Sequence, residues 1–260
     1  MVKNNIDSYK IIRVIGEGGM SKIYEAENLI SGNKVALKLY KPKISTSIFN
    51  NEVAIMTSLK HHNITRLIDY VEDEELQCIM MELLEGQDLD QKIKYSGPLS
   101  EIEFLEIFTQ ALNALNYIHK KEIIHCDIKP TNIFILTNGQ VKILDFGNAK
   151  SQDTQTHTKI STAAYMSPEQ VKSDINIDNR SDIYSLGVTM YYAINGKALY
   201  NPLFDSQNEI FSKIVNEPLS NFKIESPFIK IILKACAKNS ENRFQCCEDF
   251  IKELSFVTLA

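Results

Sequence analysis

Two short motifs near the middle of the chain carry side chains that could transfer a phosphoryl group. The segment HCDIKPTN, from His125 to Asn132, places a carboxylate at Asp127, an ammonium at Lys129 and a carboxamide at Asn132. Asp145 begins the triplet Asp-Phe-Gly thirteen residues after Asn132 and adds a second carboxylate. Groups of these types could deprotonate a hydroxyl, neutralise a phosphate in transfer and hold Mg²⁺.

A glycine-rich turn near the N-terminus could hold phosphates. Gly16, Gly18 and Gly19 lie in the sequence GEGGMSKI, between two β-rich segments. Glycine allows backbone N–H groups to approach a phosphate closely. A dinucleotide-binding turn should open a helix, so the strand expected after this turn argues against that class. Taken alone, the turn is equally consistent with an ordinary hairpin.

A lysine within an apolar strand and a glutamate fourteen residues later form a candidate pair. Along the strand VALK, alternation points Ala36 and Lys38 to the same face. Glu52 lies on the helix expected to follow, where its carboxylate could pair with the Lys38 ammonium and position it on the α- and β-phosphates of a nucleotide. The alternative is a surface lysine and an unrelated glutamate, but order and spacing after the glycine-rich turn favour the pair.

Composition and charge are those of an ordinary globular protein. The 260 residues are 44% hydrophobic and 23% charged, and the net charge of −5 gives no reason to expect bulk attraction to nucleic acid or anionic lipid. The five cysteines show no metal-ligand spacing and are expected to be free thiols in a reducing compartment. Neither a membrane span nor a signal peptide is predicted. We therefore expect a cytoplasmic protein with no nucleic-acid or membrane partner.

The elements that must position these groups change in type along the chain. β-Rich segments separated by turns dominate the first third, and helical periodicity dominates the rest. Strands are expected at Tyr9–Ile15, Ile23–Asn28, Lys34–Tyr40, Leu67–Glu72 and Gln77–Leu83. Helices are expected near Ser47–Leu59, after a capping box formed by Ser100 and Glu103, and over Asp182–Asn195, where Gly196 should end the helix.

This pattern indicates an α+β fold with two lobes. A small β-rich N-lobe at about residues 9–81 and a larger helical C-lobe at about 89–254 should be joined by a hinge at about 82–88. A nucleotide would lie in the cleft between two such lobes. The predicted domain, residues 9–254, fills nearly the whole sequence, so no additional sensor or anchor module is expected.

Taken together, the ordered motifs resemble a protein kinase catalytic domain of the eukaryotic-like (Hanks-type) Ser/Thr class found in bacteria. The resemblance covers about Tyr9 to Leu254 and implies a bilobal protein kinase fold. It rests on the motifs above and on three later markers, namely Ser167-Pro168-Glu169, Asp182 and Arg243. Any one motif would be a weak signal, whereas the complete set in this order is specific.

The resemblance implies the catalytic roles residue by residue. Asp127 resembles the carboxylate that orients the substrate hydroxyl and accepts its proton. Lys129 resembles the lysine that meets the γ-phosphate in Ser/Thr kinases, and Lys38 and Glu52 resemble the ion pair that positions the nucleotide. The implied reaction is transfer of the ATP γ-phosphate to Ser/Thr hydroxyls of protein substrates, with autophosphorylation.

The resemblance also implies a binding site for ATP and a divalent metal. Asn132 and Asp145 resemble the two ligands of Mg²⁺, with Mn²⁺ as an alternative. Met81 would be the gatekeeper, and the Glu82 carbonyl and the Leu84 backbone would hydrogen-bond adenine. The full set expected to bind ATP is Ile15, Gly16, Gly18, Ser21, Ile23, Ala36, Lys38, Met81, Glu82, Leu84, Phe134 and Asp145.

Other positions resemble structural supports. Asp182 would hold backbone N–H groups of the catalytic loop, and Glu169 would form a buried ion pair with Arg243. Losing one partner of such a pair costs about 3–5 kcal/mol. His125 and Phe146 would stack in the regulatory spine with Met56, which lies one turn after Glu52.

Two positions depart from the family pattern. Ser21 stands at the third glycine of the glycine-rich loop, and Cys126 replaces an arginine that normally pairs with a phosphorylated residue of the activation segment. A cysteine cannot form that pair, so the chain resembles non-RD kinases, whose activity need not depend on activation-loop phosphorylation. A redox role for Cys126, helped by nearby Lys129, is a weaker alternative to an inert filler.

Hydroxyl residues of the activation segment are candidates for modification. Thr162 resembles the threonine that hydrogen-bonds Asp127 and Lys129, which favours Ser/Thr substrates. The others could be autophosphorylated or could belong to an unmodified polar loop. They are Thr154, Thr156, Thr158 and Ser161.

Two other function classes compete with an active protein kinase. A pseudokinase that only binds partners is disfavoured because Lys38, Glu52, Asp127, Asn132 and Asp145 are all retained. A small-molecule kinase of the aminoglycoside type shares a similar catalytic loop but lacks the three later markers in this arrangement. The sequence predicts neither the physiological substrate nor the oligomeric state.

Overall fold

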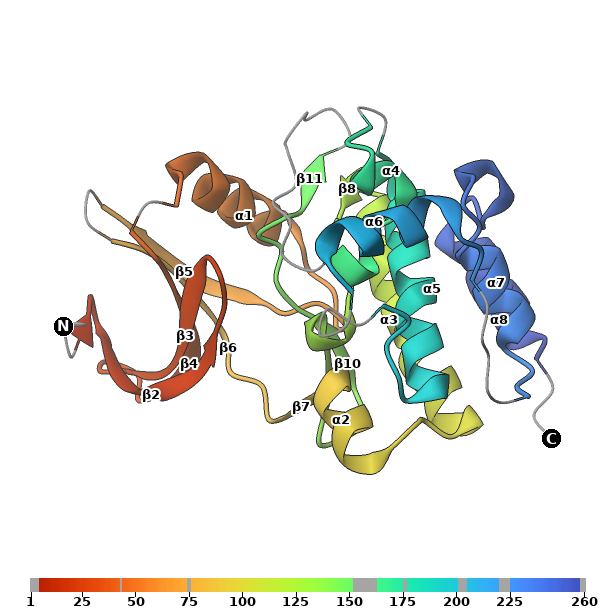
Figure 1. Ribbon diagram of the computed structural model, residues 1–260. Helices are drawn as coiled ribbons and strands as arrows, with labels where there is room; N and C mark the ends of the chain where they lie inside the picture. The colour runs from red at the N-terminus through yellow and green to blue at the C-terminus, as the bar shows by residue number, and fades with distance from the viewer. Residues whose placement is uncertain are drawn as a thin grey trace. The chain divides into compact units, whose positions relative to one another are not determined.

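The chain folds as two units of different secondary structure (Figure 1). The computed structural model describes residues 5–42, 44–73, 76–151, 163–174, 177–200, 205–219 and 225–257. Over these residues the N-terminal unit, Met1–Glu85, is built on a sheet, and the C-terminal unit, Gly86–Ala260, is mainly helical. The predicted α+β class, with a small β-rich lobe and a larger helical lobe, is confirmed.

A six-stranded antiparallel sheet forms the N-terminal unit, with the strand order β1-β2-β3-β4-β6-β5. Its strands are β1 Asn5–Ile6, β2 Tyr9–Glu17, β3 Ser21–Asn28, β4 Lys34–Tyr40, β5 Leu67–Glu72 and β6 Gln77–Glu82. Helix α1, Thr46–Ser58, contacts β5 and β6. It begins after Ser45, whose side chain accepts a hydrogen bond from the Ser47 N–H.

The register of this sheet separates its two faces. Tyr24, Leu37 and Met80 lie opposite one another on β3, β4 and β6, and all three belong to a buried apolar core. Because side chains alternate along a strand, Ala36 and Lys38 of β4 point to the other face. One face is therefore filled by the unit's own core, and the other carries the residues predicted to bind a nucleotide.

The expected strands are present, with small shifts at their ends. β4 and β5 have the predicted bounds. β2 runs past Ile15 to Glu17 and β3 starts already at Ser21, because the backbone pairs further across the glycine-rich turn than the β-rich residues alone suggest. β6 ends at Glu82, one residue earlier than expected.

Helices form most of the C-terminal unit. They are α2 Leu89–Ser96, α3 Glu101–His119, α4 Pro168–Val171, α5 Asn179–Asn195, α6 Gln207–Asn216, α7 Ile229–Ala235 and α8 Cys247–Ser255, with 3-10 turns η1 Pro130–Asn132, η2 Ala163–Tyr165 and η3 Ser240–Asn242. Helix α3 packs against α5 and α8, and α5 packs against α7 (Figure 1). Every residue of α5 from Ser181 to Ile194 is buried, so this helix forms the centre of the unit.

The ends of the helices follow local sequence signals. The predicted capping box is present at the start of α3, where Ser100 accepts a hydrogen bond from the Glu103 N–H and the Glu103 side chain reaches back to Ser100. Gly196 ends α5 in the left-handed conformation, with φ of 66°. α5 begins at Asn179 rather than Asp182, because the Asp178 side chain caps it.

Two short antiparallel sheets support the loops of the C-terminal unit. In the first, β9 Ile133–Leu136 lies between β10 Val141–Ile143 and β7 Gly86–Asp88. In the second, β8 Ile123–Ile124 pairs with β11 Lys150–Ser151. The first catalytic motif, residues 125–132, therefore lies between β8 and β9, and the Asp-Phe-Gly triplet begins two residues after the end of β10.

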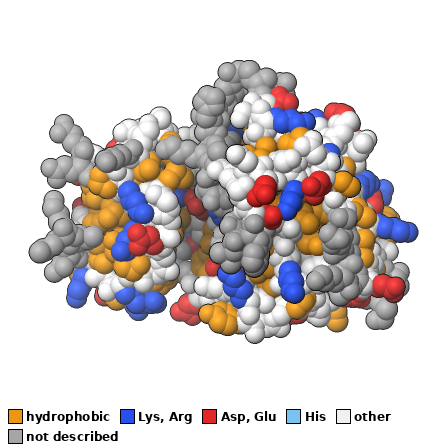
Figure 2. All heavy atoms as spheres, viewed as in Figure 1, with side chains coloured by type: hydrophobic (Ala, Val, Ile, Leu, Met, Phe, Trp, Pro, Cys, Tyr) orange, Lys and Arg blue, Asp and Glu red, His pale blue; other side chains and the backbone are white. Residues whose placement is uncertain are grey.

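The surface and the thiols agree with the composition. The face drawn in Figure 2 carries positively and negatively charged side chains together. All five cysteines are free thiols, as expected, and only Cys246 is partly exposed. Within the described ranges, no helix is both long and apolar enough to cross a membrane.

Candidate active site

Four of the residues predicted to bind ATP share one face of the N-terminal sheet. Ile23 lies opposite Lys38, and Ala36 lies opposite Met81. Directly opposed residues of an antiparallel pair point to the same side of the sheet. These four residues combine three apolar side chains, which could cover a base, with the Lys38 ammonium group, which could meet phosphates.

The Lys38 ammonium and the Glu52 carboxylate form the ion pair that their spacing predicts. Lys38 Nζ lies 2.7 Å from Oε1 and 2.8 Å from Oε2 of Glu52. Both side chains are buried, with 4% and 0% of their surface exposed. The hydroxyl of Tyr40 donates a further hydrogen bond to Glu52 Oε2. The sequence reasoning missed Tyr40, although its position two residues after Lys38 puts it on the same face of β4.

The glycine-rich turn between β2 and β3 has open space around its glycines. The Gly18 N–H donates to the Ser21 carbonyl over 2.9 Å, and Lys41 Nζ donates to the Gly18 carbonyl over 2.7 Å. Gly16, Gly18 and Gly19 do not have positive φ angles, and a Cβ at any of them would meet no described atom closer than 3.6 Å. The conformation of the turn therefore does not require glycine. Glycines at these positions are instead explained by a phosphate that approaches the backbone from outside the turn.

The segment after β6 fits the predicted contact with a base. Leu83 to Glu85 lie between β6 and β7 and belong to neither sheet. The Glu82 side chain is fixed by the Arg66 N–H, which donates to Oε1 over 2.8 Å. Within the described chain, the backbone N–H and carbonyl of Leu84 form no hydrogen bond, so both remain available to a ligand.

The catalytic motif of the C-terminal unit gathers polar groups around one carboxylate. Lys129 Nζ donates to Asp127 Oδ2 over 2.8 Å, and Asn132 Nδ2 donates to the Asp127 carbonyl over 2.8 Å. Asn148 Nδ2 also lies 3.3 Å from Asp127 Oδ2, a contact that the sequence reasoning missed. Asp127 and Lys129 are only partly exposed, at 11% and 14% of their side-chain surface.

The proximity of Asn132 and Asp145 follows from the β9–β10 hairpin. The Leu144 N–H donates to the Asn132 carbonyl over 2.9 Å, so Asp145 starts where the hairpin brings the chain back to Asn132. The amide nitrogen of Asn132 is used within the loop, which leaves the amide oxygen as its possible metal ligand. One carboxylate and one amide oxygen fit Mg²⁺, which is usually bound through one or two carboxylates plus substrate phosphates.

A buried aspartate of α5 holds the start of the catalytic loop. Asp182 accepts hydrogen bonds from the N–H groups of His125 and Cys126, at 2.8 and 2.9 Å, and its Oδ2 lies 2.8 Å from His119 Nε2. Burial alone would raise the pKa of Asp182, but the contacts with His119 and His125 hold it below its usual range. The predicted support is present, and His119 is an additional member that was not predicted.

Two residues of these motifs have strained backbones. Cys126 has φ of 62° and Asp145 has φ of 59°, in the left-handed region that favours glycine. Such conformations cost about 1–3 kcal/mol each and persist only where the surroundings enforce them. At Cys126 the enforcement comes from Asp182 and from Gln170, whose Nε2 donates to the Cys126 carbonyl over 3.0 Å.

The environment of Cys126 opposes a redox role. Its side chain is buried, and burial raises the pKa of its thiol far above the ordinary value, with further unfavourable charge from Asp182. A reactive cysteine needs a lowered pKa and access to solvent. The inert-filler interpretation therefore fits this position.

An aromatic contact and an ion pair complete the supports. His125 and Phe146 contact each other, as predicted, with ring centroids 4.9 Å apart and ring planes tilted by 58°. Their stacking with Met56 remains a prediction. Arg243 and Glu169 form the predicted pair through two bonds of 2.7 and 2.9 Å; Arg243 is buried, and the Glu169 side chain is 15% exposed. Burial would raise the pKa of Glu169, but Arg243 and the Ser181 hydroxyl, 2.6 Å away, hold it below its usual range.

The predicted site residues fall in both units. The N-terminal unit holds Ile15, Gly16, Gly18, Ser21, Ile23, Ala36, Lys38, Glu52, Met81, Glu82 and Leu84, and the C-terminal unit holds Asp127, Lys129, Asn132, Phe134 and Asp145. Phe134 lies in β9 opposite Asp88. The candidate modification sites Thr154, Thr156, Thr158, Ser161 and Thr162 lie outside the described residues.

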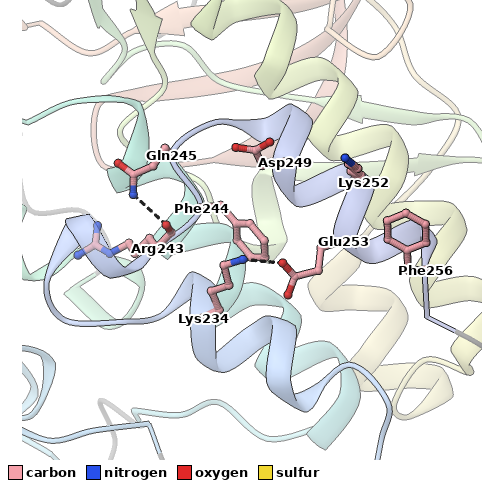
Figure 3. A pocket seen from close by; sticks show the side chains of 8 residues that line it. All are labelled: Lys234, Arg243, Phe244, Gln245, Asp249, Lys252, Glu253 and Phe256. Atoms are coloured by element: carbon pink, nitrogen blue, oxygen red, sulfur yellow. Dashed lines mark hydrogen bonds and ion pairs between the residues drawn. The ribbon is translucent and has the colours of Figure 1, made fainter.

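A pocket of about 400 Å³ in the C-terminal unit contains none of the predicted catalytic or ATP-binding residues (Figure 3). It is lined by Lys234, Arg243, Phe244, Gln245, Asp249, Lys252, Glu253 and Phe256. Across it, Lys234 is ion-paired with Glu253 and lies over the Phe244 ring. Lys234 and Glu253 thus already neutralise each other within the unit.

Comparisons with known proteins agree with the motifs. The family described as "Protein kinase domain" matches residues 9–254. The chain is 33% identical over 267 residues to the probable serine/threonine-protein kinase PknB of Lactococcus lactis, an alignment that covers 97% of this chain and 42% of that protein. It is 34% identical over 262 residues to the serine/threonine-protein kinase PrkC of Bacillus subtilis, covering 93% and 39%. For PknB of Mycobacterium tuberculosis the identity is 31% over 266 residues, covering 95% and 42%. The chain thus spans about two fifths of the length of these curated relatives.

Proposed function

The chain belongs to the protein kinase domain family, and we propose that it is a Ser/Thr protein kinase that transfers the γ-phosphate of ATP to hydroxyl groups of proteins. The observation that carries the proposal is the convergence of Lys129 and Asn132 on Asp127, beside the hairpin that returns to Asp145. The relatives named as serine/threonine-protein kinases support it.

The catalytic loop would act on the acceptor hydroxyl. The Asp127 carboxylate is suited to orient that hydroxyl and to accept its proton as the new bond to phosphorus forms. Lys129, which already contacts Asp127, would meet the transferred phosphoryl group and balance its charge. The hydrogen bond from Asn132 to the Asp127 carbonyl would keep the loop in this arrangement.

Residues of the N-terminal unit would bind ATP. We assign the base to the apolar face formed by Ile15, Ile23, Ala36 and Met81, and to the backbone of Glu82 and Leu84. Lys38, held by Glu52, would contact the α- and β-phosphates, while the turn at Gly16, Gly18 and Ser21 would cover them. From the C-terminal unit, Phe134 would contribute an apolar contact to the base.

Asn132 and Asp145 would hold the divalent metal. Their oxygen donors suit Mg²⁺, and Mn²⁺ would be accepted as well. A metal bound there would offset the negative charge of the triphosphate. Protein kinases as a family use ATP with a divalent metal. What we propose for this chain is the identity of the two ligands and of the ion.

Control of the activity would differ from that of kinases with an arginine before the catalytic aspartate. Cys126 is buried and cannot bind a phosphorylated residue, so we propose a non-RD kinase that is active without activation-loop phosphorylation. Autophosphorylation would fall on hydroxyl residues of the activation segment. The free thiols and the need for ATP favour a cytoplasmic location, with protein substrates as partners.

Phosphate transfer to a protein tests the proposal directly. Purified chain is incubated with Mg²⁺, γ-labelled ATP and casein, beside the variant Asp145→Asn and the matched control Asp249→Asn, an exposed acid on α8. We expect incorporation by the wild type and the control, and at least about a hundredfold less by Asp145→Asn. Equal incorporation by wild type and Asp145→Asn, including none, would overturn the proposal in favour of a pseudokinase. Phosphorylation of kanamycin but of no protein would instead support a small-molecule kinase.

A further inference from the structure

Tyr40 contributes a third polar group to the Lys38–Glu52 ion pair. It is the last residue of β4 and lies two residues after Lys38, so both side chains point to the same face of the strand. Its hydroxyl donates a hydrogen bond to Glu52 Oε2, which also accepts one from Lys38 Nζ at 2.8 Å. The Glu52 carboxylate is therefore held from two positions on one strand.

The ring of Tyr40 is fixed by its neighbours. It contacts the Phe49 ring edge-on, with centroids 5.4 Å apart and an interplanar angle of 90°. Phe49 is fully buried and lies on α1, about one turn before Glu52. Lys38 Nζ lies 5.2 Å from the centroid of the Tyr40 ring. Since only 5% of Tyr40 is exposed, its hydroxyl has little freedom to turn away.

Burial makes this hydrogen bond important for the pair. Burial of a carboxylate is favourable only when hydrogen bonds within the protein replace those that the carboxylate made with water. Glu52 is fully buried, and the Tyr40 phenol gives its carboxylate a second hydrogen-bond donor besides the ammonium group of Lys38. Because the Tyr40 hydroxyl belongs to a different residue of the sheet, it also keeps Glu52 in place when the Lys38 ammonium shifts toward a phosphate.

We propose that Tyr40 is a positioning residue of the nucleotide site, which holds α1 and the Glu52 carboxylate in the arrangement that presents Lys38 to ATP. This inference rests on the proposed kinase function and adds to it a residue outside the motif set. It also gives a physical reason why the ion pair can persist through contacts within the N-terminal unit alone, which suits a kinase without the phosphate-binding arginine.

The variant Tyr40→Phe removes one oxygen and keeps the ring against Phe49 and Lys38. With casein as acceptor, we expect kcat to fall about tenfold while KM for ATP changes less than about threefold, because a smaller fraction of the enzyme holds Glu52 on Lys38. The matched control is Tyr24→Phe, a buried tyrosine of the neighbouring strand that packs in the apolar core on the other face. The kcat of this control should stay within about twofold of the wild-type value.

A double-mutant cycle separates positioning from packing. If Tyr40 acts through Glu52, Tyr40→Phe should reduce activity by less than about twofold in a Glu52→Gln background. A further loss of about tenfold in that background would show an independent packing effect and would overturn the inference.

Hydrogen exchange provides a readout that does not depend on activity. Tyr40→Phe should speed amide exchange in Thr46–Ser58, the α1 helix, whereas Tyr24→Phe should not. If the wild type phosphorylates casein and Tyr40→Phe matches it in kcat and exchange, only this inference fails. If the wild type is inactive, the kinase proposal fails, and exchange in α1 still decides whether Tyr40 holds the helix.

Discussion

The two units hold their chemical groups in different ways. In the N-terminal unit, Lys38 of a strand and Glu52 of a helix meet through side chains alone, and their backbones have ordinary helical and extended forms. In the C-terminal unit, the support acts on the backbone, because Asp182 binds the N–H groups of His125 and Cys126. The first arrangement can adjust by a movement of the helix, whereas the second fixes a strained loop in one conformation.

This difference suits the two tasks. A residue that meets the phosphates of a bound nucleotide must tolerate entry and release, which side-chain contacts between elements allow. A carboxylate that accepts a proton must stay within about a hydrogen bond's length of the acceptor hydroxyl, and a fixed backbone provides that. Variants of the two arrangements should therefore fail in different ways.

The largest effect on activity is expected from Asp127→Asn. The amide keeps the shape of the side chain but cannot accept a proton, so kcat should fall about 10²- to 10⁴-fold. The free energy of unfolding should change by no more than about 1 kcal/mol, because the support of the loop acts on its backbone. Rates with casein and urea unfolding measure both quantities. A variant that loses its fold together with its activity would contradict the separation of chemistry from support.

Asp182→Ala should lower stability most. It leaves the buried N–H groups of His125 and Cys126 without their acceptor and releases a strained residue, so we expect a loss of about 3–5 kcal/mol in urea unfolding. The matched control on the same helix is Asp178→Ala, which removes an N-cap and should cost about 0.5–2 kcal/mol. Asp182→Ala should speed amide hydrogen exchange in the catalytic loop, whereas Glu52→Gln should speed it in α1. Similar costs for the two aspartates would refute a special role for the loop support.

Glu169→Gln tests the ion pair through its dependence on pH. The pKa of Glu169 is lower in the folded protein than its ordinary value of 4.5, so ionisation stabilises the fold above that pH and this contribution is lost as pH falls through the lower folded value. We expect the variant to be about 3 kcal/mol less stable at pH 7, with a difference that shrinks below about pH 4. Urea midpoints from pH 3 to pH 7 give this difference. A constant gap across that range would argue against the charge as its cause.

The smallest effect is expected from Cys126→Ala. Alanine keeps a Cβ in the same left-handed backbone, and the buried thiol has a raised pKa, so no reactive group is lost. Activity should stay within about twofold of the wild-type value, with and without prior hydrogen peroxide. Phosphatase treatment should likewise leave activity unchanged, because residue 126 is not an arginine. Protection by Cys126→Ala against peroxide would revive the redox alternative.

Local sequence patterns predicted most of the fold. β-Rich segments identified β4 and β5 with their bounds, and the capping box at Ser100 and the glycine at 196 located the ends of helices. The start of α5 was placed too late, since Asp178 acts as a cap only when the chain around it has folded into this turn. Short strands such as β7, β8 and β11 carry too few residues for a periodic signal, and they form because their partners are nearby.

The candidate site was predictable where its residues lie in short sequence motifs. Asp127, Lys129, Asn132 and Asp145 lie in two contiguous segments, and Lys38 and Glu52 have a recognisable order and spacing. Their types, order and spacing together indicated phosphoryl transfer. The roles of these residues remain predictions that the variants above test.

The tertiary structure alone decided the contacts between residues whose separations in the sequence follow no helix or strand period. Tyr40 reaches Glu52 across 12 residues, Asn148 reaches Asp127 across 21, and Asp182 reaches Cys126 across 56. Sequence fixes which donors and acceptors exist, because these are properties of the side chains themselves. Only packing selects which of them meet, because a buried polar group is stable with whichever partner the fold brings within reach.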